Sequence, residues 1–201
     1  MKFSTKELVT LAVFGTLWGI SEITLGTVLK SINIPISGIL LSTSRLLIAL
    51  VGRVFVPRKG STLFVGVIAM LLKLFSLGGV IIGPMVGIIT EAVVAEIILS
   101  ALGKPGRLSL MLAGAGGVLW VLVQPFITNP LLFGRTLLDV WFDLLRRGSQ
   151  LIGLDQSAVV GILLLMVAIH LVIGGLAGFI SWELGHQLEA RLGRGPVAES
   201  V

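Results

Sequence analysis

Apolar residues are grouped into long runs that short polar connections separate. A helix rises about 1.5 Å per residue, so about 20 apolar residues cross the roughly 30 Å hydrocarbon layer of a bilayer. The pattern predicts an all-α membrane protein, a six-transmembrane-helix bundle that forms one integral membrane domain over residues 1–201. The predicted spanning helices cover residues 7–29, 36–55, 62–77, 80–102, 108–127 and 157–185.

The connection between the fifth and sixth runs has a different pattern. In "GRTLLDVWFDLLRR", charged residues recur every four positions at Arg135, Asp139, Asp143 and Arg147, and apolar residues occupy the other face. Residues four apart on a helix are neighbours, so the stripe offers two opposite-charge pairs. We predict an amphipathic helix over residues 135–147 that lies in the outer membrane interface. The alternative is a helix packed on the bundle as a lid.

Composition agrees with a polytopic membrane protein. The chain is 55% hydrophobic and 12% charged, and its mean hydropathy is +1.07, whereas soluble domains carry about a quarter charged residues. The absence of cysteine excludes disulfides and thiolate metal sites. No Walker, GxSxG or HExxH motif is present, so we expect no enzyme, no catalytic residue, no cofactor and no metal site. Nothing indicates nucleic-acid binding, and the lipid bilayer is the expected surrounding.

The distribution of Lys and Arg predicts orientation. With the N-terminus inside, nine of these residues fall on the inner face and four on the outer face. Cytoplasmic loops carry the excess of positive charge, so we expect a multi-pass protein of the cell membrane with both termini in the cytoplasm.

Four ionisable residues lie inside the apolar runs, between the outer surface and the midplane: Glu22, Arg45, Lys73 and Glu91. Such groups cost roughly 2.5–3.5 kcal/mol at the centre of a span and are functional candidates by default. Two acids and two bases cancel if their helices face one another. The alternative is a set of structural ion pairs that fix helix packing. We interpret Arg53 and Glu96, nearer the cytoplasmic end, as such a structural pair.

Further polar and aromatic groups fall at similar heights. Trp18, Trp120, Gln124 and Asn129 complete the predicted substrate site, because indole walls and a few polar groups suit a flat heterocycle. An interfacial aromatic belt is the alternative for the tryptophans. His170, in the middle of the last run, is more often a hydrogen-bonded packing residue than a proton relay.

Small residues form one face of the first helix. In "LAVFGTLWG", Gly15 and Gly19 form a GxxxG pair with Ala12 and Thr16 beside it, a pattern that lets helices approach closely in lipid.

This chain resembles the substrate-binding S components of energy-coupling factor (ECF) vitamin transporters. The resemblance rests on size, six predicted helices, both termini inside and the small-residue text "LAVFGTLWG". It implies an outward-open pocket for a vitamin or cofactor precursor, capped in part by residues 30–35. It further implies a T-type membrane permease docked on Ala12, Gly15, Thr16 and Gly19, two cytoplasmic ATPases, and release of the cargo when the bundle topples.

The leading hypothesis is therefore a non-enzymatic binding subunit of an uptake system, with a small-molecule substrate that the sequence does not name. A proton- or ion-coupled secondary carrier that works alone, with Glu91 and His170 as titrating groups, is the second hypothesis. A structural membrane subunit is the third, and an intramembrane enzyme the last.

Overall fold

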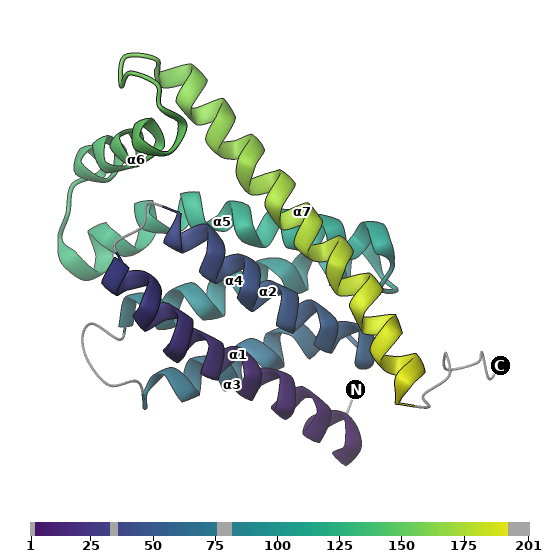
Figure 1. Cartoon of the computed structure of the whole chain (residues 1–201). Helices are drawn as coiled ribbons and strands as arrows, with labels where there is room; N and C mark the ends of the chain where they lie inside the picture. Colours follow the sequence, from purple (N-terminus) through teal and green to yellow (C-terminus); the bar gives the residue numbers. More distant parts are fainter. Residues whose placement is uncertain (1–2, 33–35, 76–81, 193–201) are drawn as a thin grey trace.

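The computed structural model describes residues 3–32, 36–75 and 82–192, and within these ranges the regular structure is entirely α-helical (Figure 1). Five helices are long and apolar enough to cross a membrane. The prediction of an all-α, multi-pass membrane protein is confirmed at this level. The helices are α1 (Thr5–Ile32), α2 (Ser37–Phe55), α3 (Ser61–Lys73), α4 (Ile82–Leu102), α5 (Arg107–Phe133), α6 (Leu137–Ile152) and α7 (Val159–Arg191).

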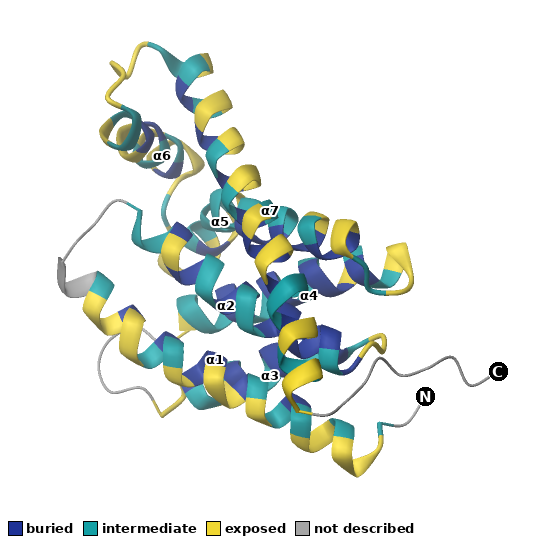
Figure 2. Cartoon of the chain, turned by 45° about the vertical axis from the view of Figure 1, so that its right-hand side comes forward, coloured by how far each residue is buried: buried dark blue, intermediate teal, exposed yellow. Residues whose placement is uncertain are grey.

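Helices α1 to α5, the shorter α3 included, run back and forth through the bundle (Figure 1). The start of α1 and the end of α7 lie at the same end, and α6 lies at the opposite end, beside the start of α7 (Figures 1 and 2). Buried residues face the interior, while the outward faces of the long helices are largely exposed and apolar (Figure 2). An apolar exterior of this kind suits lipid rather than water.

The third helix is shorter than its apolar run predicts. It has 13 residues and ends at Lys73, which gives a length of about 20 Å against the roughly 30 Å of a hydrocarbon layer. Part of the predicted span, residues 76–77, lies outside the described residues, as do residues 33–35 of the capping segment 30–35. The length criterion for a span is thus met by five of the six predicted helices.

The fifth and sixth predicted helices extend beyond their predicted ends. Helix α5 contains Pro125 and Pro130 and continues past residue 127 to Phe133. Proline removes one backbone donor, but in spanning helices neighbouring groups compensate, so a proline is a weaker stop signal there than in water. Helix α7 likewise continues past residue 185 to Arg191, because a polar sequence ends a membrane span without ending a helix.

Local sequence determines both ends of α6. The Thr136 hydroxyl accepts the backbone N–H of Asp139 at 3.1 Å, and the Asp139 carboxylate accepts the backbone N–H of Thr136 at 3.1 Å. This reciprocal capping box satisfies donors that the first turn leaves free. At the other end, Gly153 has a φ of 78°, a left-handed conformation that glycine adopts without strain. The predicted helix is present, and it continues past residue 147 to Ile152.

Helices α5 and α7 pack with their backbones in contact. A methyl group added at Gly178 would overlap the carbonyl oxygen of Leu110, and one added at Gly174 would overlap the carbonyl oxygen of Gly114. Glycine at these points lets two helices approach more closely than side chains permit, which favours association in lipid through van der Waals contact.

The structural role predicted for Arg53 and Glu96 is confirmed. Their side chains form an ion pair of 3.3 Å. The same carboxylate accepts the backbone N–H groups of Gly60 at 2.8 Å and Thr62 at 3.0 Å. Glu96 of α4 therefore holds the connection between α2 and α3 in place.

Candidate functional site

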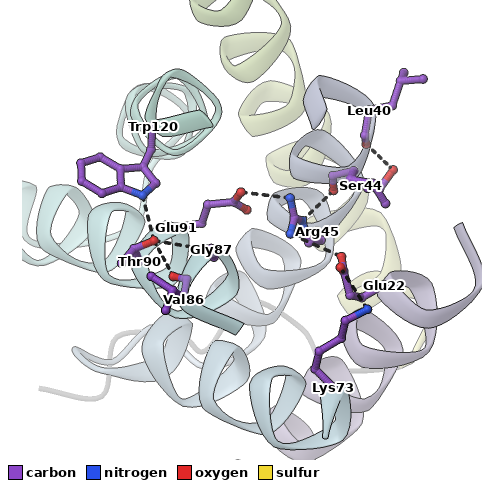
Figure 3. A network of polar contacts seen from close by, with 11 residues as sticks. Glu22, Leu40, Ser44, Arg45, Lys73, Val86, Gly87, Thr90, Glu91 and Trp120 are labelled. Carbon is purple, nitrogen blue, oxygen red and sulfur yellow. Dashed lines mark hydrogen bonds and ion pairs between the residues drawn. The ribbon is translucent and has the colours of Figure 1, made fainter. Parts of the chain in front are cut away.

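Four charged side chains from four helices meet in the interior (Figure 3). Arg45 contacts Glu22 at 3.3 Å and Glu91 at 3.0 Å, and the ammonium group of Lys73 lies 3.6 Å from Glu22. All four residues are buried. The predicted convergence of two acids and two bases is confirmed, and we call these residues the charged network.

Arg45 is the centre of this network. Its Nε donates to the carbonyl oxygen of Leu41 at 3.0 Å, which orients the guanidinium. The two remaining nitrogens then reach Glu22 on one side and Glu91 on the other. A guanidinium presents several donors in a fixed plane, so it can bridge two carboxylates where an ammonium group on a flexible stem is less suited. The net charge of the four residues is zero, which limits the cost of burying them.

A cavity of about 650 Å³ lies beside the charged network. Glu22, Arg45 and Glu91 contribute to one wall, and residues of α2, α4, α5, α6 and α7 form the rest. Small-molecule sites have volumes of roughly 300–1,000 Å³ and combine apolar walls with a few polar groups. The cavity has that size and that mixture, and it lies towards the end of the bundle where α6 packs.

Two of the predicted polar residues line this cavity. Gln124 and Asn129, both on α5, border it and are only partly buried. Neither side-chain amide has a hydrogen-bond partner among the residues that the structure describes. Each amide carries two donors and an acceptor, so these groups are open to a guest molecule or to water.

The tryptophans and the lysine lie behind the cavity rather than in its wall. Trp120 donates its indole N–H to the hydroxyl of Thr90 at 2.8 Å, and Trp18 is fully buried in the core formed by α1, α2, α3 and α4. Lys73 contacts Glu22 but does not line the cavity. The expected indole walls are therefore absent from the described lining, in which Phe126 and Phe133 supply the aromatic surface.

Three ionisable lining residues were not predicted as part of the site. Asp143 and Arg147 of α6 and His170 of α7 all border the cavity. The regular spacing of charges on α6 was visible in the sequence, but periodicity does not tell which neighbour a helix face meets. The Nδ1 atom of His170 lies 2.7 Å from the Met166 carbonyl oxygen, as expected of a hydrogen-bonded packing residue.

Helix α6 lines one side of the cavity because its apolar face packs on the bundle. Val140 and Leu145 are buried, and a methyl group added at Gly148 would overlap Ile162 and Met166 of α7. Trp141 contributes a ring contact of 6.5 Å, between centroids, with Phe126 of α5. These contacts are compatible with both the lid and the interfacial helix that we considered.

The ion pairs of α6 differ from those that the four-residue spacing suggested. Arg135 pairs with Asp143 at 2.6 Å, and Arg146 lies 3.6 Å from the same carboxylate. Asp139 takes part in the capping box instead. Arg135 precedes the helix, so the four-residue spacing of a helix does not determine which residue it contacts. The hydrogen bond from Arg135, helped by the charges of Arg135, Arg146 and Arg147, lowers the pKa of Asp143 below its ordinary value of 3.8.

This lowered pKa predicts how α6 responds to acid. A carboxyl group whose pKa is lower in the folded chain contributes stability above its unfolded value, and the contribution is lost as the pH falls through the folded value. We expect the packing of α6 to be constant above about pH 5 and to weaken below about pH 4. Hydrogen exchange of the amides of residues 144–148 measures this. Hydrogen bonds from Thr136 lower the pKa of Asp139 as well, so the D143N variant should keep a smaller acid-dependent step. An identical acid profile in that variant would contradict the assignment.

The small-residue face of α1 is divided between two surfaces. Gly15 and Gly19 are buried against Ile68 and Leu72 of α3, where an added methyl group would lie 2.6 Å and 2.7 Å from side-chain carbons. The glycine pair therefore serves a contact within the chain and is not open to a partner. The rest of the predicted docking face remains on the outside, where Ala12 and Thr16 border a shallow groove that also includes Val9, Val13 and Leu17.

The sequence matches no protein-family model, no curated protein and no solved structure. The fold and the site by themselves define a class, namely an all-helical, multi-pass membrane protein. Within it, a buried, charge-balanced network borders a cavity of small-molecule size.

Proposed function

We propose that this chain is a non-enzymatic, membrane-embedded binding subunit for the uptake of a small vitamin or cofactor precursor. The observation that carries the proposal is the cavity of about 650 Å³ beside the charged network. Charged groups in a membrane interior are costly and cluster at substrate pathways. A network placed in a cavity wall is in the position that such a role requires.

The chemistry of the lining supports a small organic guest. Open amide groups of Gln124 and Asn129 offer directional hydrogen bonds, and Phe126 and Phe133 offer apolar contact. Sites for small molecules combine a mostly apolar surface with a few well-placed polar groups that orient the ligand. A heterocycle with polar edges fits this combination better than a metal ion or a lipid tail does.

The proposal includes an orientation and partners. With both termini in the cytoplasm, the cavity lies towards the outer side, because α6 lies at the opposite end of the bundle from the start of α1 and the end of α7. A T-type membrane permease and cytoplasmic ATPases would provide the energy for uptake. The groove bordered by Ala12 and Thr16 is the surface we assign to the permease.

A matched pair of glutamine variants tests the binding function. The chain is purified in detergent, co-purifying small molecules are identified by mass spectrometry, and the affinity of the identified compound is measured by calorimetry. We expect Q124A to bind the compound about 2- to 10-fold more weakly, the value of one neutral hydrogen bond. Q150A is the control, because Gln150 is exposed on α6 and does not line the cavity.

The contrary result is equally clear. A protein that purifies without a small molecule, and whose melting temperature no compound in a vitamin panel raises, would argue strongly against the proposed function. Equal weakening by Q124A and Q150A would place the ligand outside the cavity.

A stand-alone secondary carrier is the second candidate. It is favoured by one observation, namely that two titratable residues, Glu91 and His170, border the same cavity. Protonation of such groups within a membrane is a common means of coupling transport to a proton gradient. Vesicles that contain only this chain distinguish the two candidates. Uptake that follows an imposed pH gradient without ATPases supports the carrier, and the lack of such uptake by a chain that binds its ligand supports the binding subunit.

A further inference from the structure

The two charged parts of the cavity wall, the charged network and the α6 residues, differ in net charge. In the charged network, Arg45 and Lys73 offset Glu22 and Glu91, so this wall has no net charge. It can orient a guest through hydrogen bonds, but it does not select for charge. Any selection between anions and cations must come from the wall that α6 forms.

The α6 wall has an unpaired positive charge. Asp143 is contacted by Arg135 at 2.6 Å and by Arg146 at 3.6 Å. Arg147 also borders the cavity, but it has neither a hydrogen bond nor an ion pair within 4.0 Å among the described residues. Its guanidinium is exposed, which keeps it hydrated until a guest displaces the water.

The groups that line the cavity directly are three carboxylates and two arginines, and the ion-pair partners Lys73, Arg135 and Arg146 add three basic groups behind this lining. The set contains three carboxylates and five basic groups, which is a surplus of two positive charges. Clefts with one dominant sign of charge concentrate ligands of the opposite sign. The members are Glu22, Glu91, Asp143, Arg45, Lys73, Arg135, Arg146 and Arg147.

We propose that the cavity selects a small organic anion, and that the carboxylate or phosphate group of this ligand pairs with Arg147. The inference rests on the proposed binding function and adds the class of the ligand. A guanidinium matches both anionic groups, because its parallel N–H donors bind two oxygens at once. The open amides of Gln124 and Asn129 on α5 would then contact the polar edge of the rest of the molecule.

Matched acid and neutral probes test this inference. The chain is reconstituted in nanodiscs, and calorimetry measures binding of nicotinate against nicotinamide, biotin against biotinamide, and pyridoxal phosphate against pyridoxal. We expect binding by the acid of at least one pair, about tenfold or more tighter than its neutral partner. In R147Q, the affinity for that acid should fall about tenfold or more, with little change for the neutral compound. R147K should recover part of the loss, because it restores the charge without the planar fork.

The adjacent arginine provides the control. Arg146 has the same chemistry on the same helix, but it pairs with Asp143 and does not line the cavity. We therefore expect R146Q to change the affinity less than threefold, which corresponds to a binding free energy of about 0.6 kcal/mol. Tighter binding of the neutral probes, or an R147Q variant that binds the acid unchanged, would overturn the anion inference and leave the proposed binding function intact. A failure of every probe to bind would instead overturn both. Melting temperatures confirm that each variant is folded.

Discussion

Replacing Arg45 by methionine should destabilise the protein by about 3–5 kcal/mol, the cost of breaking a buried ion pair by removing one partner. Arg45 contacts both Glu22 and Glu91, so its loss leaves two buried carboxylates with one base, Lys73, beside them. Methionine fills much of the same volume, which separates the effect of charge from that of a void. Denaturant unfolding in detergent, followed by tryptophan fluorescence, measures the loss.

A second substitution tests the electrostatic cause. R45M combined with E91Q leaves one carboxylate, Glu22, paired with Lys73, so the charge balance returns. We expect this double variant to recover most of the lost stability. The control is R58M, because Arg58 forms an exposed pair with Glu7, and such pairs contribute about 0–1 kcal/mol. If R45M were no less stable than R58M, the charged network would not be essential for the fold.

Replacing Gly178 by alanine should cost about 1–3 kcal/mol or more, as expected when a methyl group is forced into a closely packed contact. The added carbon would overlap the Leu110 carbonyl oxygen, which is backbone, so the overlap can be relieved only by moving α5 and α7 apart. Separation of these helices would also widen the cavity, because both contribute to its walls. The melting temperature and the affinity for any bound compound should therefore fall together.

Gly175 provides a control with the opposite expected sign. It lies on the same helix, and no heavy atom of a neighbour lies within 4 Å of an added methyl group. Alanine is favoured over glycine in a helix interior by about 0.8–1.0 kcal/mol in water, so G175A should be neutral or slightly stabilising. Equal losses in G175A and G178A would show that helix propensity, and not the close contact, determines the effect.

The charged network could be predicted from the sequence, because the sequence shows both the cost of burying each ionisable residue and its depth along the helix. An ionisable residue in an apolar run requires a partner, and the fixed rise per residue gives its height. Arg45 and Glu91 lie at compatible heights on their helices, and they are in contact. The same argument paired Arg53 with Glu96.

The division of α1 shows where that argument ends. Sequence spacing places Ala12, Gly15, Thr16 and Gly19 on one small-residue face, but it does not say which of them meet another helix of the same chain. The structure buries the glycines against α3 and leaves the other two beside a surface groove. In a membrane, lipid and protein present similarly apolar surroundings, so hydrophobicity alone does not distinguish them.

The sequence by itself determined the helical, membrane-spanning class and the burial of opposite charges, because span length and the cost of buried charge are local properties. Only the tertiary structure decided that α6 lines the cavity, that Arg147 borders it and that Trp18 and Trp120 do not. These features depend on the rotation of each helix about its axis and on its neighbours. Both are determined by packing between segments far apart in the chain.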